Sequence, residues 1–325
     1  MTRQITDSMP LARRPDVPRT VASHIILLLL FYCCLFLPAD AAYAAEHAKV
    51  AIIISSKIRP YLDALEGFKE TFPAEPDLFD MSANPELARH MVLSGEYDLA
   101  VSIGPAATDM LWGLDLPEAR RLSCMVLDLE EHVHGKKGCG VDLRIPLARQ
   151  LDIIRARMPD RKKTGILYNP SENSRIVDNA MEYAEDTGHR IIPIPVTAPD
   201  EILPVFSRVI ASSAIDSMIF IPDSTVTSSR ALIKHLVKTA FINRIAVAGY
   251  NSFFMKAGAV VSFVIEYQKS GRSAGELASS ILAGKEKCAI IPPPFRVEWN
   301  DTVWKKLEES VGGEDNNMAS AGGER

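Results

Sequence analysis

Several features that define large protein classes are scarce or absent in this sequence of 325 residues. Its five cysteines include no Cys-x-x-Cys pair, which argues against a thiolate zinc site, a thioredoxin-type redox motif and a disulfide scaffold. No run of five like charges occurs and the formal net charge is −5, so a nucleic-acid partner is disfavoured. The longest apolar run is shorter than the roughly 20 residues that a membrane-spanning helix needs.

The motifs that hold nucleotide phosphates are also missing. No Gly-x-Gly-x-x-Gly follows an expected strand, and no Gly-x-x-x-x-Gly-Lys-Ser/Thr is present. We identify no nucleophile elbow, and Cys124 with a distant histidine is not the signature of a catalytic thiol. We therefore expect no enzyme activity and no cofactor.

The first 44 residues have the order of a secretory signal peptide. Arg13, Arg14 and Arg19 precede an apolar run of 13 residues, Ile25–Leu37, which is too short to span a membrane. The stretch Ala42-Tyr43-Ala44 fits the small-x-small cleavage rule, so we expect cleavage after Ala44 and export to the periplasm. An uncleaved N-terminal anchor is the alternative, and Met9 is an equally good start of translation.

The remaining chain alternates between expected strands and helices. Apolar runs predict the strands, and apolar residues at helical spacing predict the helices between them. In the first half the expected strands are Lys49–Ile54, Leu78–Met81, Tyr97–Ile103 and Leu122–Leu127. The pattern then starts again with Thr164–Tyr168, Arg190–Ile194, Ile215–Ile221 and Ile245–Tyr250. Nearly all-apolar strands that alternate with helices predict parallel sheets covered on both faces, so we expect an α/β fold with two lobes.

Removal of the signal peptide leaves three cysteines, of which one must stay unpaired. Cys124 lies in an apolar strand and Cys139 in a glycine-flanked segment 15 residues further on, so a disulfide between them is sterically possible. The alternative is that both are small buried hydrophobic residues.

Polar turns, or turns with glycine and proline, follow the carboxyl ends of most expected strands. They are Ser55-Ser56, Gly104–Thr108, Asn169–Ser171, Pro222–Thr225 and Asn251-Ser252. In open parallel sheets ligands bind at this edge, where helix N-termini present free N–H groups. The same residue types cap helices, so any single turn is explained by capping alone. Turns of this kind on both lobes favour a shared ligand site.

The segments YDLAVSIGPAATDML, TGILYNPSENS, IFIPDSTVTSS and IAVAGYNSFFMKAGAVVSF carry a family resemblance. In order and spacing they resemble the ABC-transporter substrate-binding proteins of the family that includes tryptophan and tyrosine importers. The resemblance covers nearly the whole mature chain. It implies a type I periplasmic-binding-protein fold, with two Rossmann-like lobes, three crossing segments and a ligand cleft between the lobes.

The same resemblance implies where the lobes begin and end. We expect a signal peptide over 1–44, an N-terminal lobe of 45–162 plus 256–285, a C-terminal lobe of 163–255 plus 286–310, and a disordered tail over 311–325.

The resemblance also implies a set of ligand-binding residues. The N–H groups of Ala106 and Ala107 and the Thr108 hydroxyl would receive a carboxylate at a helix N-terminus, where the dipole favours an anion. Asp223 would accept a ligand ammonium group at the cleft rim, with Asn169 and Tyr250 closing from the second lobe. The full expected set is Ser55, Ser56, Gly104, Ala106, Ala107, Thr108, Asn169, Asp223, Ser224, Thr225, Tyr250 and Asn251.

Two departures from the family pattern leave the identity of the ligand open. Relatives carry a His-Pro-like pair after the first strand, where this chain has Ser55–Pro60. Their Gly-Thr-Pro-like turn lacks its threonine here, because Pro105 follows Gly104 directly. Lys57 and Arg59 offer charge for a further acidic group, although such residues at the start of a surface helix are commonly only solvated.

The implied function is an exported solute-binding protein that captures a small molecule, an amino acid or a similar amine or carboxylate compound. It would deliver this molecule to an ABC permease in the inner membrane, and we expect a monomer with no nucleic-acid partner. The alternatives are a ligand-sensing subunit that reports to a membrane histidine kinase and an enzyme on the same scaffold. Glu130–His134 has the residue types of a zinc site, but its position in a polar loop argues against a metal.

Overall fold

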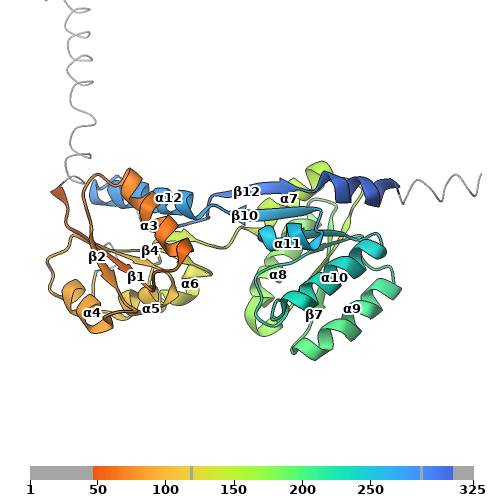
Figure 1. The fold of residues 1–325 in the computed structure, drawn as a ribbon, viewed down its shortest axis with the longest axis horizontal. Helices are drawn as coiled ribbons and strands as arrows, with labels where there is room; N and C mark the ends of the chain where they lie inside the picture. Colours follow the sequence, from red (N-terminus) through yellow and green to blue (C-terminus); the bar gives the residue numbers. More distant parts are fainter. Residues whose placement is uncertain (1–46, 118–119, 286–287, 310–325) are drawn as a thin grey trace, which may run out of the picture.

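The computed structural model describes residues 47–117, 120–285 and 288–309. The expected signal peptide over 1–44 and tail over 311–325 lie outside these ranges. Figure 1 shows two α/β lobes joined by extended segments at one end. Within the described ranges, no helix has both the length and the apolar character needed to cross a membrane.

The first lobe is built on a six-stranded sheet in the order β11-β5-β4-β3-β1-β2, with every neighbouring pair parallel. β1, β3 and β4 are buried along their whole length, which explains why their sequences are nearly continuous apolar runs. The strands are β1 (Val50–Ile54), β2 (Asp77–Asp80), β3 (Leu99–Ile103), β4 (Arg121–Val126), β5 (Gly140–Asp142) and β11 (Ile290–Ile291).

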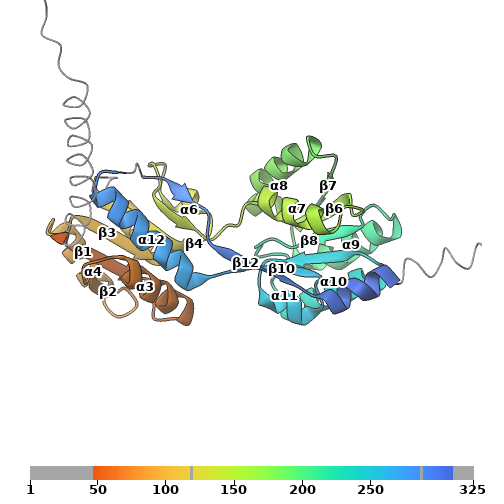
Figure 2. The ribbon, with the colours of Figure 1, turned by 90° about the horizontal axis from the view of Figure 1, so that it is seen from above.

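Helices cover both faces of this sheet, as expected. Phe68 of α3 and Leu277 of α12 join the core on one face, and Figure 2 shows these two helices side by side. Val92 of α4 and Leu111 of α5 pack against Ile53 on the other face. The helices are α3 (Arg59–Thr71), α4 (Pro85–Leu93), α5 (Pro105–Gly113), α6 (Leu129–His132) and α12 (Tyr267–Leu282).

The second lobe has a six-stranded sheet in the order β12-β10-β9-β8-β6-β7. Its strands are parallel except β12, which runs antiparallel to β10. They are β6 (Lys163–Tyr168), β7 (Arg190–Pro195), β8 (Ser217–Ile219), β9 (Ala246–Gly249), β10 (Val261–Ile265) and β12 (Phe295–Trp299).

The helices of the second lobe also divide between two faces. Leu151 and Val177 pack on one face with Ile166, and Phe206 and Leu236 pack on the other. The helices are α7 (Leu147–Arg157), α8 (Pro170–Glu185), η2 (Pro199–Glu201), α9 (Ile202–Ala211), α10 (Arg230–Ile242), α11 (Ser252–Ala257) and a last helix over 301–309.

The chain crosses between the lobes at other places than those expected. The first crossing is near residues 143–146, because the apolar face of α7 packs in the core of the second lobe. The second lies between β10 and α12, because β10 pairs with β9, and the third lies between β11 and β12. The expected boundaries at 162, 256 and 286 are therefore wrong, although α12 does return to the first lobe.

The disulfide joins Cys139 to Cys288, with their Cα atoms 5.0 Å apart. Neither alternative for Cys124 and Cys139 holds for both residues, because Cys139 pairs with Cys288 and Cys124 alone is a buried free thiol. In β4, Cys124 is paired with Val141 of β5. β11 pairs with the other edge of β5, and this brings Cys288, which precedes β11, next to Cys139. Cys124 stays a buried free thiol whose pKa burial raises to about 12, so it is chemically inert.

Residues 271–275 spell Gly-x-Ser-x-Gly, which α/β-hydrolases use at a strand-to-helix turn. In this chain the pattern lies inside α12 and marks no nucleophile elbow. A Cβ on Gly271 would come within 1.8 Å of the Ala64 carbonyl oxygen, and one on Gly275 within 2.4 Å of Thr71 Oγ1. These glycines allow α12 to pack closely on α3.

Candidate functional site

The turns after β1 and β3 meet at the edge of the first sheet. Ser55 Oγ accepts a hydrogen bond from the Ala107 N–H at 2.9 Å. Gly104 adopts a φ of 94°, and a Cβ there would lie 2.7 Å from both Ser55 Oγ and the Tyr61 ring, so only glycine fits. The structure therefore brings Ser55, Gly104 and Ala107 together as expected and adds Tyr61 to them.

The expected carboxylate cradle at the start of α5 is only partly available. The Ala107 N–H is taken by Ser55, and the Thr108 hydroxyl donates to the Gly104 carbonyl oxygen at 2.9 Å. Thr108 is 0% exposed, so its hydroxyl does not lie on the surface of this turn. Ala106 is exposed, and its N–H lies in the first turn, where a helix provides no acceptor of its own.

Asp223 is the centre of the turns in the second lobe. Its Oδ1 accepts the N–H groups of Thr225 at 3.0 Å and Val226 at 2.9 Å. Its Oδ2 accepts the Asn169 N–H at 2.7 Å and Asn173 Nδ2 at 2.9 Å. With four protein donors and 4% exposure, Asp223 does not lie at an accessible rim, and that expectation is wrong. The carboxylate joins the turns after β6 and β8.

The other expected residues of these two turns also contact one another. Asn169 Nδ2 donates to Thr225 Oγ1 at 2.8 Å, and Asn169 Oδ1 caps α8 by accepting the Ser171 N–H at 3.0 Å. The Ser224 N–H donates to Glu172 Oε2 at 2.8 Å. Thr225 is buried and Ser224 is exposed, so Ser224 is the more accessible of the two.

Tyr250 and Asn251 follow β9. The Tyr250 ring is half-buried and packs on Phe254, with the ring centroids 5.1 Å apart. Asn251 Oδ1 accepts the Phe253 N–H at 3.0 Å and so caps α11. Capping thus explains the side-chain position of Asn251, and Tyr250 belongs to the wall of a small cavity beside the first crossing.

Ser56 and Lys57 lie directly before α3, and Arg59 is the first residue of that helix. Ser56 is half-buried, and the two basic side chains are exposed. Lys57 Nζ lies 3.5 Å from Asp80 Oδ2, and Arg59 Nε lies 2.6 Å from Asp63 Oδ1. Both basic residues therefore pair with acidic residues of their own lobe.

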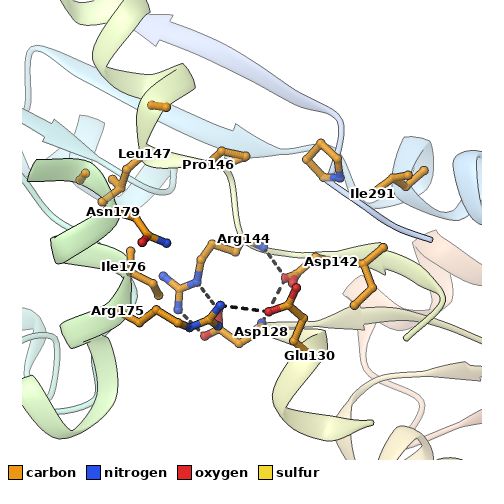
Figure 3. Close-up of a pocket in the computed structure, with 14 residues that line it drawn as sticks. Asp128, Glu130, Asp142, Arg144, Pro146, Leu147, Arg175, Ile176, Asn179 and Ile291 are labelled. Atoms are coloured by element: carbon orange, nitrogen blue, oxygen red, sulfur yellow. Dashed lines mark hydrogen bonds and ion pairs between the residues drawn. The ribbon is translucent and has the colours of Figure 1, made fainter. Parts of the chain in front are cut away.

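A cavity of about 350 Å³ lies between the lobes, and both lobes line it (Figure 3). Figure 3 shows Arg144 and Arg175 directed toward carboxylates of the first lobe. The lining residues are Asp128, Glu130, Asp142 and Ile290–Pro292 from the first lobe, Arg144 and Pro146 from the first crossing, and Leu147, Ala148, Arg175, Ile176, Asn179 and Ala180 from the second lobe.

Arg144 is the central charge of this cavity. Its guanidinium forms a two-pronged ion pair with Asp128, in which the two side chains are only 15% and 14% exposed. Arg144 Nη2 also lies 3.4 Å from Asn173 Oδ1, and Asn173 in turn donates to Asp223. Polar contacts thus run from the first lobe, through the crossing segment, to the turns of the second lobe.

Two further acidic residues add negative charge to the same cavity. Burial raises the pKa of the Asp142 carboxyl, and hydrogen bonds from the backbone N–H groups of Arg144 and Leu129 oppose that shift. Glu130 pairs with Arg175 at 3.0 Å across the two lobes, and both side chains are exposed. The cavity therefore presents charges of both signs to any molecule that enters it.

The residues of this cavity were missing from the expected set. Asp128 follows the expected strand Leu122–Leu127 directly, so the rule that selected the other turns would also have found it. Asp142 and Arg144 follow β5, which has three residues and gives no detectable periodicity. Arg175 lies within α8, where no sequence motif distinguishes it from a solvated surface charge.

The residues that the structure describes contain no group of three or more His, Cys, Asp and Glu side chains placed to hold a metal ion. Glu130–His132 belong to the short helix α6 and not to the expected loop, and His132 Nδ1 lies 2.7 Å from Asp109 Oδ1.

A family model described as ABC transporter substrate binding protein matches residues 127–297, more than half of the chain. The tyrosine-binding protein of Clostridioides difficile (strain R20291) is 29% identical over 143 residues, or 43% of this chain. That match spans only 40% of the relative's own length.

Two solved structures share the fold. One is an ABC domain in complex with L-Trp from Streptococcus pneumonia, with 18% identity and a TM-score of 0.52 over 80% of this chain and 94% of that chain. The other is the ligand-free, open structure of a substrate binding protein with adhesive properties from Clostridium difficile. It has 21% identity and a TM-score of 0.64 over 80% of this chain and 95% of that chain.

Proposed function

Because the chain belongs to the ABC transporter substrate-binding protein family, we propose that it captures a small molecule between its lobes and delivers it to an ABC permease. Its fold is the type I periplasmic-binding-protein fold, two parallel-dominated α/β lobes joined by three crossings. Proteins of this family are substrate-binding proteins and not enzymes. Export to the periplasm, where such a receptor meets its ligand, is part of the proposal.

The observation that carries the proposal is the cavity of about 350 Å³ lined from both lobes by carboxylates and guanidinium groups. Its volume lies in the range of pockets for small molecules. An amino acid, which carries an ammonium and a carboxylate, matches a cavity with both signs of charge. The names of the tyrosine-binding relative and the L-Trp complex support the same ligand class.

We assign both charged ends of the ligand to groups of the first lobe. The Ser55 hydroxyl and the Ala106 N–H at the start of α5 are the partners for its carboxylate, since a helix N-terminus favours an anion. Glu130 and Asp142 replace Asp223 as partners for its ammonium group, because both line the cavity. Ser224 and Tyr250 approach the ligand from the second lobe when the lobes close.

A thermal-shift screen tests this function. Protein refolded free of ligand is heated with amino acids, small peptides and nucleosides, and ligand retained by the untreated protein is identified by mass spectrometry. A ligand that binds only the folded protein stabilises it by about 2.7 kcal/mol at 100 times its Kd, so at least one amino acid should raise the melting temperature. Peptide or nucleoside shifts without any amino-acid shift would refute the ligand class, and no shift at all would refute the receptor.

A further inference from the structure

A second, much smaller cavity adjoins the interlobe cavity at the first crossing. It has a volume of about 30 Å³ and shares Arg144 and Leu147 with its larger neighbour. A water molecule needs roughly 10–15 Å³ of such space, so the cavity admits one or two groups of that size and not a whole ligand. The remaining walls are Leu143, Ile145, Gln150, Ile221, Pro222, Tyr250 and Ile265.

Gln150 is the unusual residue of this cavity, because its side chain is polar, buried and only half satisfied. The residue is 5% exposed, and its Nε2 donates to the Ile145 carbonyl oxygen at 2.9 Å. This bond fixes the amide, since the reverse orientation would place two carbonyl oxygens against each other. Oε1 is then buried, and it makes no hydrogen bond to any residue that the structure describes. A buried amide oxygen without a donor carries a desolvation cost.

We propose that this cavity is a binding site for one small hydrogen-bond donor, which Gln150 Oε1 accepts. The donor is a water molecule or the amino group of the ligand that lies in the interlobe cavity; the second source rests on the proposed function. Tyr250, another residue of the cavity wall, carries a hydroxyl group that could serve either donor as a second partner. Arg144 also lines this cavity, but its guanidinium donates to Asp128. Gln150 Oε1 therefore remains an acceptor that has no donor among the residues that the structure describes.

The location gives the site a consequence for closure of the lobes. Its walls include residues of the first crossing, Leu143–Ile145, and Ile265 at the start of the second crossing. A donor bound to Gln150 therefore lies where the first crossing enters the second lobe and the second crossing leaves it. Whichever donor fills the site, it contacts the segments about which the lobes would move.

Crystal structures of the ligand-free protein and of its complex with L-tryptophan or L-tyrosine test the proposal directly. We expect density within about 3.2 Å of Gln150 Oε1 in at least one of the two states, as hydrogen-bond geometry requires. A water there in both states identifies water as the donor, and the ligand nitrogen there in the complex identifies the amino group. No density at the site in either state, or a protein donor bonded to Oε1, would overturn the proposal.

The Gln150→Met variant distinguishes the two donors in solution, because it removes the acceptor and keeps a side chain of similar length. Calorimetry compares each amino acid with its analogue that lacks the amino group, using Gln268→Met on α12 as the control substitution. If the amino group is the donor, Gln150→Met lowers the affinity for the amino acid tenfold or more and leaves the affinity for the analogue unchanged. If water is the donor, both affinities change by the same factor.

Failure of this inference can be told apart from failure of the proposed function. If Gln150→Met binds both compounds like the parent protein and no density appears beside Oε1, the inference fails while the receptor function stands. If the parent protein binds neither amino acid, the choice of ligand fails, and the ligand-free crystal structure still decides whether water occupies the site. If the variant does not fold, the two crystal structures of the parent protein decide alone.

Discussion

At the scale of single residues, Asp223 shows how one buried carboxylate organises two turns. It accepts three hydrogen bonds from the turns after β6 and β8 and one from Asn173 of α8, and its exposure is 4%. A carboxylate with this many N–H donors is a structural element of the turns, although its sequence position had made it the candidate for a ligand ammonium group.

Asp223→Asn should therefore reduce stability more than it reduces ligand affinity. The new amide NH₂ group faces N–H donors, so at least one charge-assisted hydrogen bond is lost, and the free energy of unfolding should fall by about 1.5–3 kcal/mol. Urea denaturation measures the change, with Asp178→Asn, an exposed residue of α8, as the matched control. Equal stability of the two variants would show that the Asp223 carboxylate does not hold the turns together.

The disulfide gives a second prediction at this scale. Cys139 and Cys288 are 149 residues apart in sequence, and their bond fastens the segment before β11 to β5. Replacing both cysteines by alanine should lower the free energy of unfolding by about 2–5 kcal/mol, the usual loss for a native disulfide.

Thiol titration of the denatured exported protein provides the control for that measurement. Cys124 should react before reduction, and Cys139 and Cys288 should react only after it. A peptide map that links Cys124 to Cys139, or unchanged stability of the double variant, would contradict the pairing.

At the scale of elements, the contact between α3 and α12 holds the returning segment on the first lobe. The helices approach so closely that three positions, Gly67, Gly271 and Gly275, have no space for a Cβ. At Gly271 the obstacle is the backbone of Ala64, which no side-chain rotation relieves. This close packing secures α12 between the second and third crossings, and so holds the first-lobe ends of both.

Gly271→Ala should therefore destabilise the protein, even though alanine is the better helix former. Overpacking of this kind costs about 1–3 kcal/mol, more than the gain of roughly 1 kcal/mol in helix propensity. Gly113→Ala in α5 is the matched control, because a Cβ there meets nothing within 4 Å, and it should be neutral or slightly stabilising. Thermal unfolding of the two variants checks the prediction, which fails if both melt at the same temperature.

The elements that the sequence predicted well are those whose burial is uniform or whose ends carry local signals. β1, β3 and β6 lie inside covered sheets, so their apolar runs stand out. Asn84 and Asn169 cap the helices that follow them, and asparagine is one of the residue types that helix starts prefer.

The features that sequence did not predict depend on partners far away in the chain. β5 and β11 have three and two residues and become strands only through their neighbours in the sheet. α7 has an apolar face that suits either lobe, and only packing assigns it to the second. The burial of Asp223 is not visible from its own segment, because two of the residues that donate to it, Asn169 and Asn173, lie 54 and 50 residues earlier.

At the scale of the whole molecule, the two lobes are separate cores connected by three crossings. Hinge motion about such segments is the expected response to a ligand that contacts both lobes. The polar contacts through Arg144 reach Asp128 on one lobe and Asn173 on the other, so this residue lies where the motion would be centred. A ligand shifts the equilibrium from the open to the closed form only to the extent that it binds the closed form more tightly than the open one.

The measurement that tests this account most directly is small-angle X-ray scattering of ligand-free protein with and without a saturating amino acid found in the thermal-shift screen. Binding between the lobes should close them, so the radius of gyration should fall and the longest interatomic distance should shorten on addition of ligand. The change should follow the same saturation curve as the calorimetric heat. Stoichiometric binding that leaves the scattering profile unchanged would contradict capture between the lobes.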